Sequence, residues 1–158
     1  MNSLAEKRAE PPAENEAQAL LASCQVEVSP ESFSLVSVTH SEFADMLQNS
    51  GISPRGASPF LILADKHEVT LMLADEDLRL VRHALNDARV ESGFRLVTFD
   101  VVLDFAVVGF FAEISRMLAD AKIPLMAVSA YSRDHILIKQ GDLARALAVL
   151  GSVNSELC

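Results

Sequence analysis

Several residue types are scarce in this 158-residue sequence, which has no tryptophan, one tyrosine, six glycines and two cysteines. Cys24 and Cys158 are too few for a disulfide framework or a four-ligand zinc site. No glycine-rich phosphate-binding motif is present, so the sequence predicts no nucleotide-binding loop. The most apolar stretch, residues 96–114, is interrupted by Asp100 and Asp104, whereas a membrane-spanning helix needs about 20 mostly apolar residues. We therefore expect no membrane span and no bound cofactor.

Basic residues are also few, with 13 Lys and Arg against 22 Asp and Glu, for a formal net charge of −9. Nucleic acid and anionic membrane surfaces repel such a protein, so neither is an expected partner. Half of the residues are hydrophobic, which is typical of a globular chain. His40, His67 and His83 lack the spacing of metal ligands. We expect a cytoplasmic protein without a metal site.

The second half of the sequence repeats the pattern of the first at a fixed distance. Pro59 and Pro124 are 65 positions apart, and so are Leu78 and Leu143. A shared offset over turn, strand, helix start and helix indicates two copies of one unit. Predicted strands cover residues 33–38, 59–63, 69–73, 95–103, 124–128 and 135–139, and predicted helices begin near Ser41, Asp75, Gly109 and Asp142.

Each copy has the order strand, helix, strand, strand, helix, which is most of a ferredoxin-like βαββαβ module. A unit of roughly 60 residues buries little surface alone, and two copies side by side would cover each other's open strand edges. We predict an α+β fold of two such units, with antiparallel sheets side by side and helices on one face. The units would span residues 23–92 and 93–151, between an acidic, disordered tail over 1–22 and a C-terminal tail over 152–158. A short helix near residues 15–22 is an alternative for part of the first tail.

The segment from Gly109 to Leu150 resembles an ACT domain. The resemblance rests on Gly109 before an apolar helix, on Ile123-Pro124 at the start of a strand, and on the Ser129–Asp134 segment before the next strand. In particular, the segment resembles the tandem ACT proteins related to the CASTOR-type arginine sensors and their small bacterial and fungal relatives. The first copy matches more loosely, and the resemblance covers about residues 25–150.

This resemblance implies a regulatory or sensory protein that binds a free amino acid between adjacent ACT units and catalyses nothing. It also implies self-association, with a homodimer as the expected form, and leaves room for a protein partner. Val107 stands where the arginine-binding proteins have an acidic residue, so arginine is not identified as the ligand, although Asp104 could supply a carboxylate nearby. The ligand-binding residues that it implies are Asp104, Val108, Gly109, Phe110, Ser129, Ala130, Tyr131 and Asp134.

Elementary chemistry gives two of these residues a role. Free backbone N–H groups at a helix start suit the carboxylate of an amino acid, and Gly109 lets the backbone approach a ligand closely. Asp134 is the candidate partner for the ammonium group. At the 65-residue offset these positions correspond to Ala44 and Val69, so the fold by itself does not demand them. Either residue could equally serve a turn, and Tyr131 could line a pocket or cover a sheet edge.

Two functions therefore remain open: an amino acid-binding regulatory protein, and a ligand-free module for dimerisation or protein interaction. An enzyme is disfavoured because no nucleophile and base stand in a recognisable arrangement. His135 follows Asp134 directly, but adjacent residues of a strand point to opposite faces of the sheet.

Overall fold

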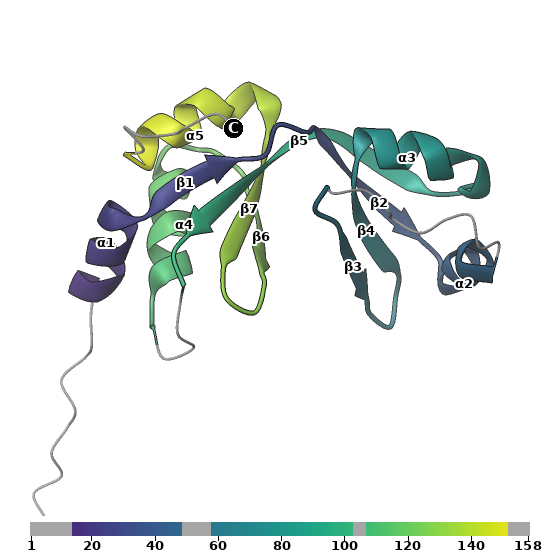
Figure 1. The fold of residues 1–158 in the computed structure, drawn as a ribbon, viewed down its shortest axis with the longest axis horizontal. Helices are drawn as coiled ribbons and strands as arrows, with labels where there is room; N and C mark the ends of the chain where they lie inside the picture. Colours follow the sequence, from purple (N-terminus) through teal and green to yellow (C-terminus); the bar gives the residue numbers. More distant parts are fainter. Residues whose placement is uncertain (1–13, 49–57, 103–106, 152–158) are drawn as a thin grey trace, which may run out of the picture.

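The computed structural model describes residues 14–48, 58–102 and 107–151. Within these ranges seven strands form one antiparallel sheet in the order β3-β4-β2-β5-β7-β6, with β1 paired to β5. Helices cover one face of this curled sheet (Figure 1). The predicted α+β fold with ferredoxin-like units is confirmed. None of the helices in the described ranges is long and apolar enough to cross a membrane.

The long strand β5 (Arg89–Asp100) belongs to both halves of the sheet. Its first part pairs with β2, and its second part pairs with β1 and β7. The register of β2 against β5 shifts between Phe33 and Leu35, close to Gly93 with a φ of 82°. Such a bulge bends a strand, and here the two units diverge from the bend (Figure 1).

The first unit has the strand order β3-β4-β2-β5, which is the order of a ferredoxin-like module. Its two helices pack on one face, over the cluster that includes Val36, Leu71 and Leu78. Its elements are β2 (Phe33–Val38), α2 (His40–Gln48), β3 (Leu61–Ala64), β4 (Val69–Ala74) and α3 (Asp75–Val81), followed by the short helix η1 (Arg82–Ala84).

The second unit has the matching order β1-β5-β7-β6 and a larger core under three helices. Phe99, Ile114 and Ile136 are fully buried in this core. Its remaining elements are α1 (Glu14–Ser23), β1 (Gln25–Val28), α4 (Phe110–Asp120), β6 (Met126–Ser129), β7 (Asp134–Lys139), the short helix η2 (Gln140–Asp142) and α5 (Leu143–Val149).

The units differ from the predicted ranges 23–92 and 93–151 in two ways. The division after residue 92 falls inside β5, because this strand is the fourth strand of the first unit and the first strand of the second. The strand β1 pairs with residues 97–100 and so lies in the second unit, although it precedes the first unit in the sequence. The second unit is therefore assembled from both ends of the chain.

The predicted disordered tail is wrong for residues 14–22, where the alternative of a short helix holds. Helix α1 packs against α4, with Ala17 only 2% exposed and Leu21 in the core of the second unit. Burial of these apolar side chains stabilises the helix where local sequence alone does not.

The 65-residue offset holds from β3 to α3 but fails upstream. Ser34 pairs with Leu73 in the first unit, and Arg95 pairs with Ile138 in the second. Because Leu73 and Ile138 are themselves 65 positions apart, Ser34 is equivalent to Arg95 and the offset between β2 and β5 is 61. Nine residues connect β5 to α4, where Thr39 alone connects β2 to α2, but only five connect α4 to β6, where twelve connect α2 to β3. The longer first connection is therefore largely offset by the shorter second one, and the offset returns to 65 at β3.

Candidate functional site

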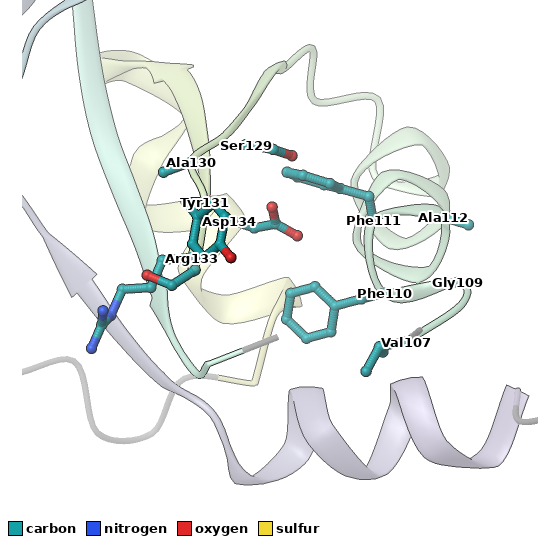
Figure 2. A pocket seen from close by; sticks show the side chains of 11 residues that line it. Val107, Gly109, Phe110, Phe111, Ala112, Ser129, Ala130, Tyr131, Arg133 and Asp134 are labelled. Carbon is teal, nitrogen blue, oxygen red and sulfur yellow. The ribbon is translucent and has the colours of Figure 1, made fainter. Parts of the chain in front are cut away.

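A pocket of about 310 Å³ lies between the start of α4 and the β6–β7 hairpin (Figure 2). Its volume is at the small end of the range for ligand sites, about 300–1,000 Å³. The lining residues are Val107, Gly109, Phe110, Phe111, Ala112, Ser129, Ala130, Tyr131, Ser132, Arg133 and Asp134.

Gly109 forms the N-cap of α4 in a left-handed conformation, with φ 93° and ψ 0°. Such a conformation favours glycine, because a Cβ atom makes it costly. No side chain of the described residues caps this helix start, so with respect to them the first-turn N–H groups keep their hydrogen-bonding capacity for a ligand. The helix dipole also favours a negative charge at this point.

The corresponding helix start in the first unit is closed by its own side chains. Thr39 precedes α2, and its Oγ1 accepts a hydrogen bond from the backbone N–H of Glu42 at 3.2 Å. The Glu42 carboxylate accepts one in return from the N–H of Thr39 at 3.1 Å. This reciprocal pair is a capping box. Thr39, rather than Ala44, is thus the counterpart of Gly109. Of these two corresponding helix starts, α2 has a side-chain cap and α4 has none from the described residues.

Asp134 supplies the carboxylate of the pocket. It is the first residue of β7, on the same face of the strand as Ile136 and Ile138, which are buried under the helices. Its side chain points into the space beside Phe110 and Phe111 (Figure 2). The carboxylate makes no hydrogen bond or ion pair with any residue in the described ranges. Its counterpart Val69 is fully buried in the first unit.

Arg133 does not neutralise Asp134. Its Nε donates to Oδ1 of Asp100 at 2.7 Å, and its side chain extends away from the pocket (Figure 2). The hairpin turn is closed by the backbone hydrogen bond from Ala130 N–H to the Arg133 carbonyl at 2.9 Å. Tyr131 lies at the tip of this turn and is 86% exposed. The turn therefore presents hydroxyl groups and one unpaired carboxylate.

Aromatic rings form the apolar wall. Phe110 is 3% exposed and meets Phe99 edge to face, with ring centroids 5.6 Å apart. This contact ties the wall of the pocket to the core of the second unit, because edge-to-face aromatic pairs add stabilisation beyond burial. The pocket thus combines helix N–H groups, one carboxylate and a rigid apolar wall.

His135 lies on the other face of the sheet, as the alternation along a strand predicts. Its Nδ1 and the Thr98 hydroxyl are hydrogen-bonded at 2.9 Å. Burial lowers the pKa of His135, with a smaller opposing effect from the Asp134 charge. The histidine and Asp134 do not form a dyad in the pocket. In the described part of the chain, no group of three or more His, Cys, Asp or Glu side chains is placed to hold a metal ion.

Six of the eight predicted site residues line the pocket: Gly109, Phe110, Ser129, Ala130, Tyr131 and Asp134. Val108 does not line it and is 63% exposed, and Asp104 lies outside the described residues. Five lining residues were missed, although each lies within two positions of a predicted one: Val107, Phe111, Ala112, Ser132 and Arg133. The resemblance implied a ligand site between adjacent units. Every lining residue of this pocket belongs to the second unit, so within one chain the pocket does not lie between the two units.

Comparison with known proteins agrees with this architecture. Residues 89–152 match the family model of the ACT domain, a segment that contains β5, α4, β6, β7 and α5. The comparison with curated proteins found none that matches.

Solved structures of the same fold cover both units. The protein Atu0741 from Agrobacterium tumefaciens has a TM-score of 0.63 and 17% identity, over 85% of this chain and 92% of its own. VC0802 from Vibrio cholerae, a protein of unknown function and possible transport protein, has a TM-score of 0.61 and 22% identity, over 86% and 94%. The regulatory subunit of aspartate kinase from Thermus thermophilus has a TM-score of 0.56 and 11% identity, over 82% and 97%.

Proposed function

We propose that this protein is a non-catalytic regulatory protein that binds a free amino acid in the pocket between α4 and the β6–β7 hairpin. One observation carries the proposal: the Asp134 carboxylate, which has no hydrogen-bond or ion-pair partner among the described residues, faces a pocket that also contains a helix start without a side-chain cap from those residues. An amino acid has a carboxylate for the helix N–H groups and an ammonium group for Asp134. In the first unit a capping box and Val69 take these two places.

The comparisons support a regulatory role. The matched family is the ACT domain, and one similar structure is the regulatory subunit of an aspartate kinase. The pocket lining contains no histidine, cysteine or lysine, so it offers neither a strong base nor an activated nucleophile. The proposal therefore assigns the pocket to binding rather than catalysis, in a cytoplasmic protein.

A ligand-free interaction module is the second candidate, and the edge strand β3 favours it. Phe60, Ile62 and Leu63 are large apolar residues that remain exposed on or beside this edge. Exposed strand edges with apolar side chains are sites of pairing between chains. Both candidates include a homodimer, and an additional protein partner is compatible with either.

Thermal unfolding with each of the twenty amino acids in turn tests the proposal. At one hundred times its Kd, a ligand that binds only the folded protein raises the free energy of unfolding by about 2.7 kcal/mol. We expect at least one amino acid to raise the Tm, and Asp134→Asn to remove that shift while the unliganded variant stays folded. Asp120→Asn is the matched control, since Asp120 is an exposed carboxylate at the end of α4 that pairs with Arg116.

Two outcomes would contradict the proposal. Unchanged melting with all twenty amino acids at millimolar concentration would favour the interaction module. A ligand-induced shift that survives in Asp134→Asn would place the amino acid elsewhere.

A further inference from the structure

Another pocket, of about 550 Å³, lies in the first unit, between α3 and β5 on the helix-covered side of the sheet. It lies at the other end of the unit from α2 and its capping box, so it is not the counterpart of the pocket beside Gly109. Its lining residues are Ser34, Asp75, Leu78, Arg79, Arg82, Val90 and Ser92.

Charged and hydroxyl groups converge on this pocket. Asp75, Arg79 and Arg82 recur at intervals of three or four residues, and such residues share one face of a helix. Opposite them, Ser34 is 1% exposed, and its Oγ donates to Oδ1 of Asp75 at 2.7 Å. The Oγ atoms of Ser34 and Ser92 are 2.8 Å apart. Because the single hydroxyl hydrogen of Ser34 is donated to Asp75, Ser92 is the donor in this second hydrogen bond. Two hydroxyl groups, one carboxylate and two guanidinium groups therefore face one cavity.

The second unit shows what occupies the equivalent space. Arg95 is the counterpart of Ser34 by strand register, and Gln140 is the counterpart of Asp75 at the 65-residue offset. The Arg95 guanidinium donates from Nη1 to Oε1 of Gln140 at 2.9 Å and from Nη2 to the Ser29 carbonyl at 2.6 Å. The second unit thus fills this place with its own guanidinium group.

The first unit has the complementary composition. Serine replaces the arginine and opens the cavity, and the Asp75 carboxylate replaces the Gln140 amide. A carboxylate is a stronger acceptor for a cation than an amide oxygen, because its hydrogen bonds are charge-assisted. Removal of the internal cation and addition of a negative charge at its acceptor create a site that suits an external cation.

The two arginines of the pocket are not required by the fold. Their counterparts at the 65-residue offset are Ala144 and Leu147, an alanine and a leucine. Arg79 pairs with Glu76 on the exposed side of α3 at 3.1 Å. The Arg82 side chain makes no hydrogen bond or ion pair with any residue that the structure describes. Its guanidinium group remains available for a carboxylate, which it can bind with two parallel hydrogen bonds.

From this arrangement we propose that the pocket between α3 and β5 binds a small molecule that carries a guanidinium or ammonium group at one end and a carboxylate at the other. The cation replaces the internal guanidinium of the second unit and binds Asp75, with the Ser34 and Ser92 hydroxyl groups beside it. The carboxylate binds Arg82. This site is independent of the pocket that contains Asp134.

Calorimetric titration of the full chain tests the chemistry with three probes. L-arginine has both charged ends, agmatine lacks the carboxylate, and L-citrulline replaces the guanidinium with a neutral group of similar shape. We expect L-arginine to bind and each of the other two probes to bind about tenfold to a hundredfold more weakly. A hydrogen bond to a charged group contributes about 1.5–3 kcal/mol, and each 1.4 kcal/mol corresponds to a factor of ten in Kd.

Variants locate the binding. Asp75→Asn keeps the shape of the side chain and should lower the affinity for L-arginine by about tenfold or more. The control Glu76→Gln removes the same charge one residue along the same helix, outside the pocket, and should leave the affinity unchanged. Arg82→Gln should lower the affinity for L-arginine to that for agmatine, and should leave the affinity for agmatine unchanged. Ser34→Arg would place a guanidinium in the pocket, as in the second unit, and should abolish binding of both.

The outcomes separate this site from the proposed amino acid pocket. Binding of L-arginine that is lost in Asp134→Asn but kept in Asp75→Asn would overturn the inference and support the proposed function. Absence of binding in the unmodified protein would overturn the inference alone, because the screen of twenty amino acids still tests the Asp134 pocket. If Asp75→Asn fails to fold, unchanged L-arginine affinity in Arg82→Gln overturns the inference equally.

Discussion

Replacement of Gly109 by alanine is expected to lower the free energy of unfolding by about 1–2 kcal/mol, through the backbone alone. Residue 109 has a φ of 93°, and a residue with a Cβ atom is disfavoured in the left-handed region by about that amount. The added methyl group would lie 3.9 Å from Cβ of Ala17, which is ordinary van der Waals contact. Packing between α1 and α4 therefore adds no further penalty.

Urea unfolding measures this loss against a matched control. With a slope of about 2 kcal/mol per M, the midpoint should fall by about 0.5–1 M. Gly151→Ala is the control, because Gly151 also has a positive φ, 69°, and a Cβ atom added there would meet no other atom within 4 Å. The two variants should lose similar stability. Only Gly109→Ala should also weaken the ligand-induced Tm shift, because only Gly109 lines the pocket.

Two results would refute this reasoning. An unchanged urea midpoint in Gly109→Ala would mean that residue 109 does not hold the left-handed conformation in solution. A loss several times larger than that of Gly151→Ala would mean that α1 presses on the start of α4 more closely than the 3.9 Å contact indicates.

Three further predictions concern stability and reactivity. Leu21→Ala should cost about 2–4 kcal/mol in urea unfolding, since Leu21 is a core residue; a loss below 0.5 kcal/mol, the usual size for surface sites, would contradict the docking of α1. Burial, and then the Asp100 charge, raise the pKa of Cys24 to about 11, so in a Cys158→Ser background iodoacetamide should react at pH 8 far more slowly than with an ordinary thiol of pKa about 8.5. Burial lowers the pKa of His135, so protonation favours the unfolded chain and the free energy of unfolding should fall as the pH drops below about 6.5. His135→Gln should flatten that slope, and an unchanged slope would remove the histidine as its cause.

Local sequence patterns were sufficient for most of the regular elements. Alternation predicted β2 over the same residues that the structure shows, and the apolar spacing after Gly109 predicted α4. The fixed offset from Pro59 to Leu85 predicted the repeat, because both copies keep the same strand and helix lengths there. By contrast, residues 89–94 lack the alternation of a half-buried strand. They form a strand because their backbone pairs with β2.

The site was predicted in part for the same reason. Gly109, Ser129 and Asp134 are placed by a helix start and a hairpin, which are local features that a sequence can reveal. The absence of a side-chain cap at Gly109 became meaningful only beside the Thr39–Glu42 capping box of the other unit. The polar pocket beside α3 had no sequence signal, because Ser34 and Ser92 are 58 positions apart and neither belongs to a motif.

The sequence alone determined which segments are strands and helices, and that one unit is present twice, because hydrophobic periodicity and turn residues act over a few positions. Tertiary structure alone decided that β1 completes the second unit, that β5 serves both units, and that Ser34 rather than Arg95 faces an open pocket. These features depend on strand pairing between distant residues, whose free energy comes from burial and hydrogen bonding across the whole sheet.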